Sequence, residues 1–130
     1  MSNNEKKKIL LLFGDDLRNL FILNQILSKY KNCKVVIQKR DKEKIKQNSK
    51  PLVAKHLKLR DNSEKKILRI KKDHIKNFKD KTYINLGELN SKKIINLVKA
   101  YKPDITICFG IAYIKKKLLN ALPKKTFNIH

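Results

Sequence analysis

Two polar side chains near the carboxyl end of the sequence could do chemistry. Asn128 and His130 are separated by one apolar residue, Ile129. Alternate side chains of a strand point to the same face, so the carboxamide and the imidazole would lie together there. A carboxamide N–H can donate to a developing oxyanion, and an imidazole can move protons near neutral pH. The pair suits acyl or formyl transfer; the alternative is a polar strand end that is simply exposed.

Short apolar runs predict the strands that must position this pair. Ile9–Phe13 ends at Gly14 and Ile105–Phe109 ends at Gly110, a pattern typical of parallel strands buried on both faces. Further strands are predicted at residues 35–37, 83–86 and 126–130, with Gly87 as a turn.

Helical spacing predicts helices between these strands. Asp15 or Asp16 can cap the first helix, and Asn90 or Ser91 can cap a later one that ends before Pro103. The apolar face expected for the first helix consists of Leu17, Leu20, Phe21, Leu27 and Tyr30. A short basic helix is expected to carry Leu118, Leu119 and Leu122. The Lys-rich stretch at residues 42–81 also favours helix, with a break at Pro51.

The alternation of strands and helices predicts an α/β fold, a doubly wound, mostly parallel sheet with helices on both faces. Ligands of such sheets bind beyond the carboxyl ends of the strands, where the strand order reverses. The candidate site therefore comprises Gly14–Arg18, Gly110–Tyr113 and Asn128–His130. A dinucleotide site is not expected, because the first strand is followed by two carboxylates and by no glycine-rich loop.

Length and charge give a second, competing interpretation. The chain has 130 residues, which predicts one domain, and 33 Lys+Arg against 11 Asp+Glu give a net charge of +22. Such a charge favours polyanions, so a non-catalytic Lys-rich domain that binds nucleic acid is the alternative function. The basic residues are nearly all Lys and accompany many Ile and Asn, a combination that A/T-rich codons would also produce.

Cysteine content and hydropathy exclude other classes. Cys33 and Cys108 cannot build a disulfide framework or a four-ligand zinc site, and no metal site is expected. Cys108 lies within an apolar run and is interpreted as a small core residue. The apolar stretches are too short for a secretion signal or a membrane span, so the protein is expected in the cytoplasm, with no membrane partner.

The second half of the sequence resembles a known family. The strand at Ile105–Phe109, the loop that follows, the helix at Lys115–Leu122 and the segment Phe127–His130 resemble the folate-dependent formyltransferases. That family acts on glycinamide ribonucleotide, methionyl-tRNA and amino sugar nucleotides. The resemblance extends over most of the chain but is sharp only from about Leu89 onward. It implies a Rossmann-like amino-terminal domain that binds 10-formyltetrahydrofolate.

The resemblance also implies roles for individual residues. Asn128 and His130 match the family's Asn-x-His pair, so Asn128 would hold the formyl oxygen and His130 would assist proton transfer from the attacking amine. The loop that would line the folate pocket consists of Phe109, Gly110, Ile111, Ala112, Tyr113 and Ile114. Its length is closer to that of the sugar-type members, which favours an amino sugar nucleotide as acceptor, with methionyl-tRNA as the alternative.

Two departures from the family pattern concern the carboxyl end. The family's catalytic Asp and a Gly/Ser/Pro-rich loop come after the Asn-x-His pair, and this sequence ends at His130. The sequence is therefore interpreted as an incomplete amino-terminal domain, and the isolated chain is expected to be inactive.

Weaker candidates complete the set. Gly14, Asp15 and Arg18 follow the first strand, where Arg18 could meet an anionic group of the substrate. His56, Arg60 and Glu64 recur at four-residue spacing, which is more typical of a solvated helix face than of a binding site. Cys33 has no nearby base, and His74 is expected to be solvated.

Overall fold

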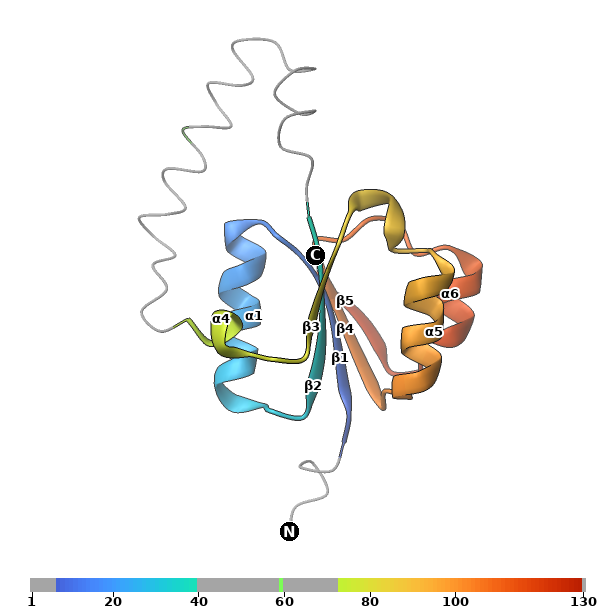
Figure 1. Ribbon diagram of the computed structural model, residues 1–130, viewed down its shortest axis with the longest axis horizontal. Coiled ribbons are helices and arrows are strands. Elements are labelled where there is room, and N and C mark those ends of the chain that lie inside the picture. The colour runs from blue at the N-terminus through green and yellow to red at the C-terminus, as the bar shows by residue number, and fades with distance from the viewer. Residues whose placement is uncertain (1–6, 40–58, 60–72, 130) are drawn as a thin grey trace.

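Five short strands and the helices between them make up the part of the chain that the structure describes. The computed structural model describes residues 7–39, 59 and 73–129 (Figure 1). In chain order the elements are β1 (Ile9–Gly14), α1 (Leu17–Lys29), β2 (Cys33–Gln38), α4 (His74–Asn77), β3 (Lys81–Ile84), the 3-10 turn η2 (Leu86–Glu88), α5 (Lys92–Tyr101), β4 (Ile105–Phe109), α6 (Lys116–Ala121) and β5 (Thr126–Ile129).

The strands form one parallel sheet in the order β3-β2-β1-β4-β5. Each neighbouring pair is parallel. Helices α1 and α4 cover one face, and α5 and α6 cover the other (Figure 1). The prediction of a doubly wound α/β fold is confirmed, and the arrangement is Rossmann-like. The chain moves outward from β1 in one direction through β2 and β3 and in the other through β4 and β5, so the strand order reverses between β1 and β4.

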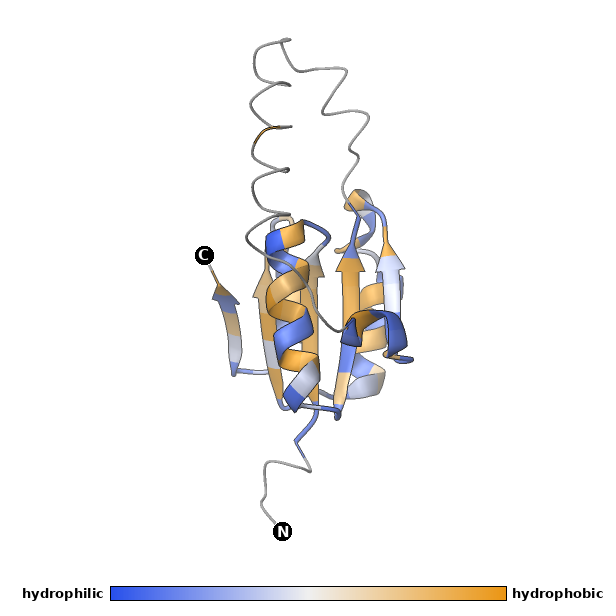
Figure 2. Ribbon diagram, turned by 90° about the vertical axis from the view of Figure 1, so that its left-hand side faces the viewer, coloured by the Kyte–Doolittle hydropathy of each residue, from blue (hydrophilic) through white to orange (hydrophobic). Residues whose placement is uncertain are grey.

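The central strands are mostly apolar because both of their faces are covered (Figure 2). In β1, Leu10 and Leu12 pack toward α5 and α6, whereas Leu11 and Phe13 pack toward α1. All four side chains are fully buried. The alternation of a strand therefore divides one apolar run between two hydrophobic cores.

Helix α1 is rotated from the face that the sequence predicted. Its buried residues are Asn19, Leu23, Asn24 and Leu27. Tyr30 was expected on the apolar face, but it lies at the end of the helix and is half exposed. The prediction was correct for Leu27, which is buried, and for Leu20, which packs against the core. It missed Leu23 and the two asparagines, which a search for apolar periodicity passes over.

The cap positions of α1 and α5 and the end of α5 were predicted correctly, but the expected capping hydrogen bonds from side chains are not made. Asp16 and Ser91 occupy the cap positions of α1 and α5, yet neither side chain makes a capping hydrogen bond. Helix α5 ends two residues before Pro103, and Lys102 adopts a left-handed conformation, with φ at 53°. The helix therefore stops where the sequence predicted, through the backbone rather than through a side-chain cap.

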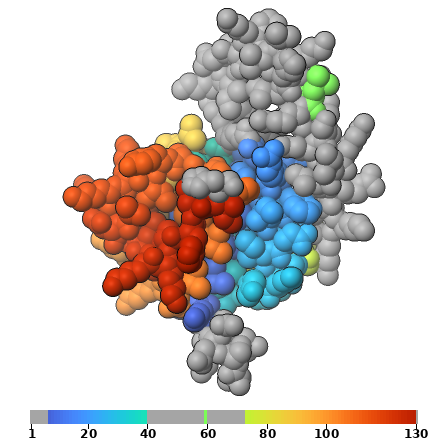
Figure 3. All heavy atoms as spheres, turned by 180° about the vertical axis from the view of Figure 1, so that it is seen from behind, coloured from blue at the N-terminus to red at the C-terminus, as the bar shows by residue number. Residues whose placement is uncertain are grey.

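Strand β5 forms one edge of the sheet and lies at the surface (Figure 3). Phe127 is opposite Ile107 and Ile129 is opposite Phe109 in the parallel register. Phe127 and Ile129 are 57% and 40% exposed, so the apolar side chains of β5 on the α1 side of the sheet are open to solvent. Asn128, between them in sequence, points to the other face.

Several predictions fall on residues outside the described ranges. They include most of the Lys-rich stretch at 42–81, the His56, Arg60 and Glu64 set, and His130. Of that stretch, His74 begins the short helix α4 and is partly buried. No helix within the described ranges is long and apolar enough to cross a membrane.

Candidate functional site

The point where the strand order reverses is closed by two glycines and one asparagine. Gly14 and Gly110 follow the paired residues Phe13 and Phe109 at the ends of β1 and β4. A Cβ on Gly14 would collide with the carbonyl oxygen of Gly110 and would lie 2.8 Å from Nδ2 of Asn19. A Cβ on Gly110, whose φ is +69°, would collide with the Asn19 carboxamide. Asn19, only 6% exposed, therefore fills the space between the two strand ends.

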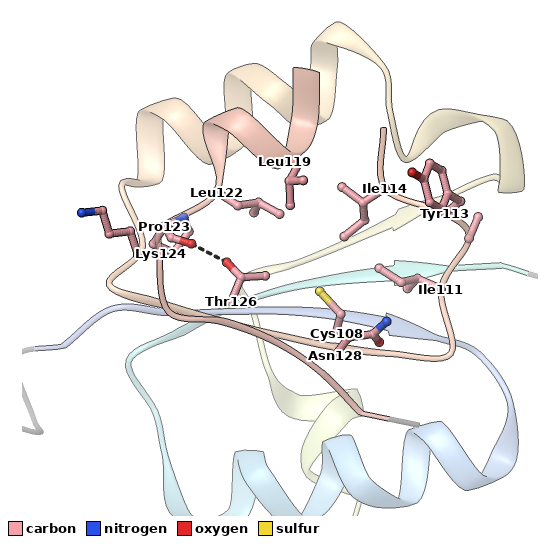
Figure 4. Close-up of a pocket in the computed structure, with 11 residues that line it drawn as sticks. Cys108, Ile111, Tyr113, Ile114, Leu119, Leu122, Pro123, Lys124, Thr126 and Asn128 are labelled. Atoms are coloured by element: carbon pink, nitrogen blue, oxygen red, sulfur yellow. Dashed lines mark hydrogen bonds between the residues drawn. The ribbon is translucent and has the colours of Figure 1, made fainter. Parts of the chain in front are cut away.

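An open pocket of about 590 Å³ lies beside this point, on the face that α6 covers (Figure 4). Its lining combines the end of β4, the loop after it, one side of α6 and the inner face of β5. The lining residues are Cys108, Ile111, Ala112, Tyr113, Ile114, Leu119, Leu122, Pro123, Lys124, Thr126 and Asn128. The volume is within the range of about 300–1,000 Å³ that small-molecule sites occupy.

The pocket brings together Asn128 and the predicted folate loop, which are 14 or more positions apart in the sequence. Asn128 is paired with Cys108 across β4 and β5, and both side chains line the pocket (Figure 4). Ile111–Ile114, four of the six residues predicted for the folate loop, line it as well. The sequence therefore predicted both polar and apolar elements of one cavity.

Asn128 supplies a carboxamide that the described part of the chain leaves without a hydrogen-bond partner. The hydroxyl of Thr126 is already used, because its Oγ1 donates to the carbonyl of Pro123 at 2.6 Å, and Tyr113, whose side chain carries the second hydroxyl of the lining, is 84% exposed. Asn128 is thus the carboxamide of the lining, and it can both donate to and accept from a neutral ligand.

The charged and titratable groups of the lining are few. Burial raises the pKa of the Cys108 thiol to about 11, so this sulfur is protonated and a poor nucleophile at neutral pH. Lys124 places one cationic side chain at the rim. Within residues 7–39, 59 and 73–129, no three His, Cys, Asp or Glu side chains are grouped to hold a metal ion. The lining therefore offers mainly apolar contact and neutral hydrogen bonds, with Lys124 as its one cationic side chain.

The other predicted site residues do not line the pocket. Phe109 packs its ring against that of Phe13, with centroids 5.9 Å apart, on the opposite face of the sheet. Gly14 is buried against Gly110, and Arg18 is exposed on the first turn of α1, one turn after Asp15. The substrate roles proposed for Gly14, Asp15 and Arg18 remain predictions.

Three residues to which the sequence interpretation gave no role in the site shape it. They are Asn19, which fills the reversal point, and Gln38 and Asn90, which hydrogen-bond the loop after β4. Asn19 could have been noticed as a polar residue at a core-facing helical position. The partners of Gln38 and Asn90 lie 23 or more residues away, so no local pattern reveals them.

A comparison of this chain with models of protein families, with curated proteins and with solved structures finds no match in any of the three. The fold is therefore established by the strand order alone, and the assignment of a function rests on the residues of the pocket.

Proposed function

We propose that this pocket binds 10-formyltetrahydrofolate and that the protein transfers its formyl group to a primary amine of a small metabolite, such as an amino sugar nucleotide. The observation that carries the proposal is the convergence of Asn128 with the Ile111–Ile114 loop in one pocket. In the family that the sequence resembles, these two elements hold the formyl group and the folate ring.

The chemistry of the lining fits a flat heteroaromatic ligand. Ile111, Ile114, Leu119 and Leu122 offer apolar contact to the faces of a ring. No hydrogen bond within the described ranges occupies the peptide N–H groups of Ile111, Tyr113 and Ile114. Loop amides of this kind can donate to ring nitrogens and carbonyl oxygens, and the Lys124 ammonium can attract a carboxylate tail.

The proposed mechanism assigns a single task to each of two side chains. 10-Formyltetrahydrofolate supplies a formyl carbon that is already activated for attack by an amine. The Nδ2–H of Asn128 donates to the formyl oxygen as negative charge develops on it. His130 accepts the proton that the attacking amine loses and returns it to N10 of the folate as the bond between N10 and the formyl carbon breaks, so that tetrahydrofolate leaves. Loss of one such oxyanion donor typically costs about 10²–10³ in kcat.

The first test measures binding, because the catalytic Asp of the family has no counterpart among the matched residues. The probe is 5-formyltetrahydrofolate, a stable isomer, titrated calorimetrically into the full chain. We expect saturable binding that weakens by about 2–10-fold in Asn128→Ala, the loss of one neutral hydrogen bond. The control is Asn96→Ala, at an exposed position of α5 outside the pocket lining, and it should bind as the wild type does.

The same titration separates this proposal from a Lys-rich polyanion-binding domain. Folate binding through neutral contacts should change little between 50 and 200 mM salt. A protein that neutralises six or more phosphates loses about 10³-fold or more in affinity over that range. Absence of folate binding, together with salt-sensitive binding of a single-stranded oligonucleotide, would reject the formyltransferase proposal and favour a polyanion-binding domain. Binding of both probes would favour a tRNA-linked acceptor.

A further inference from the structure

The side chain of Gln38, the last residue of β2, hydrogen-bonds the loop after β4. Nε2 of Gln38 donates to the carbonyl oxygen of Leu86 at 3.0 Å, and Oε1 of Gln38 accepts from the backbone N–H of Ala112 at 2.9 Å. Gln38 is only 3% exposed, and both bonds are partly buried. One carboxamide thereby links the ends of β2, η2 and the pocket loop.

A second carboxamide holds the other end of the same loop. Nδ2 of Asn90 donates to the carbonyl oxygen of Tyr113 at 2.9 Å, and Oδ1 of Asn90 accepts from the backbone N–H of Lys115 at 2.8 Å. Asn90 lies immediately before the cap position of α5, so the helix start and the loop are joined. Each carboxamide uses its donor and its acceptor, which fixes its orientation.

We propose that Gln38 and Asn90 are positioning residues for the pocket and name this pair the carboxamide clamp. The clamp takes up the N–H groups of Ala112 and Lys115 and the carbonyl of Tyr113. The remaining N–H groups of the loop are thereby presented to a ligand. A preordered loop loses less conformational freedom when a ligand binds, so the clamp raises affinity without touching the ligand. That last step rests on the proposed function, whereas the ordering of the loop does not.

The ordering is tested by amide hydrogen exchange on the ligand-free protein. Gln38→Met keeps the length of the side chain and removes both bonds. We expect exchange at Ala112 to accelerate about tenfold, the effect of losing one buried hydrogen bond, while amides of β1 and β4 stay protected. Gln25→Met, at an exposed position of α1, is the matched control and should leave Ala112 unchanged.

A conservative variant provides the rescue. The protonated carboxyl of Gln38→Glu can donate to Leu86 and accept from Ala112, as the carboxamide does. Since the carboxyl oxygen accepts from Ala112 in either ionisation state, protection at Ala112, corrected for the intrinsic exchange rate, should be closer to wild type than in Gln38→Met. If Gln38→Met does not fold, Asn90→Ala carries the test through faster exchange at Lys115. Unchanged protection at Ala112 in folded Gln38→Met, or at Lys115 in Asn90→Ala, would overturn the clamp.

The ligand step is tested with 5-formyltetrahydrofolate on the same variants. We expect Gln38→Met to bind more weakly than wild type by at least about fivefold, with Asn128 intact. If Gln38→Met binds the probe as tightly as the wild type does, although its Ala112 amide exchanges faster, the positioning role is rejected and the proposed function is unaffected. If the wild type does not bind the probe, the proposed function fails, and the clamp is then judged on the exchange data alone.

Discussion

Replacement of Gly110 by alanine tests the closed reversal point between β1 and β4. The φ of Gly110 is +69°, and a left-handed conformation costs an alanine about 1–2 kcal/mol. The added methyl would also lie 2.7 Å from Cγ of Asn19, a side chain that is buried and cannot easily move away. Overpacking of this kind costs about 1–3 kcal/mol. We therefore expect Gly110→Ala to lower the free energy of unfolding by about 2–5 kcal/mol, the sum of the two costs.

The steric part of this loss can be isolated by a double-mutant cycle. In an Asn19→Ala background the clash is absent, so Gly110→Ala should cost only the strain of its left-handed backbone, about 1–2 kcal/mol. The coupling between the two positions is then about 1–3 kcal/mol. Urea unfolding at 25 °C measures all four proteins, and the slope of the transition shows whether the folded state has stayed compact.

Gly87 provides the matched control for the same substitution. It lies in the 3-10 turn η2, and a Cβ at this position would meet nothing within 4 Å. Gly87→Ala should therefore change the free energy of unfolding by less than about 0.5 kcal/mol. A Gly110→Ala protein as stable as wild type, or a coupling to Asn19 near zero, would refute the packing described for the reversal point.

Two further predictions concern the core. Burial raises the pKa of Cys108 from 9.0 to about 11 and is the largest cause that raises the pKa of Tyr101 from 10.0 to about 12. The unfolded chain thus releases these protons at lower pH than the folded protein does, so the free energy of unfolding should fall as pH rises from about 9 to about 12. Urea unfolding at pH 8 and pH 11 should show a smaller fall in Cys108→Ala than in the wild type. An equal fall in the two proteins would contradict the assignment to Cys108. Leu118→Ala should cost about 2–5 kcal/mol because that side chain is fully buried in α6, and Leu119→Ala, at a position 54% exposed, should cost less than about 1 kcal/mol; equal losses in thermal unfolding would show that α6 packs through another face.

Much of the fold could be predicted because its signals are local. The run Ile9–Phe13 and the glycine after it predicted β1 to within one residue. The strand at Ile105–Phe109 was predicted at its observed bounds. These runs are continuous because parallel strands in the middle of a sheet are covered on both faces. The strand predicted at 83–86 was displaced by two residues, because Lys81 and Thr82 pair with β2 although neither is apolar.

The site could be predicted only in part because its remaining contacts join distant segments. The Asn128 position and the Ile111–Ile114 loop followed from a resemblance and from the alternation of a strand. The roles of Gln38 and Asn19 depend on which strand lies beside which, a property that the strand order decides. Asn90 was interpreted as a possible helix cap, and its carboxamide instead bonds the pocket loop.

The central claim is that a formylated folate occupies the pocket formed by Asn128 and the Ile111–Ile114 loop. The most direct measurement is a two-dimensional amide NMR titration of the ¹⁵N-labelled chain with 5-formyltetrahydrofolate at 150 mM salt. We predict that the largest shifts occur at the amides of Ile111, Tyr113 and Ile114 and at the side-chain NH₂ of Asn128, with little change in α1. Shifts confined to residues outside the pocket, or none at millimolar folate, would contradict the claim.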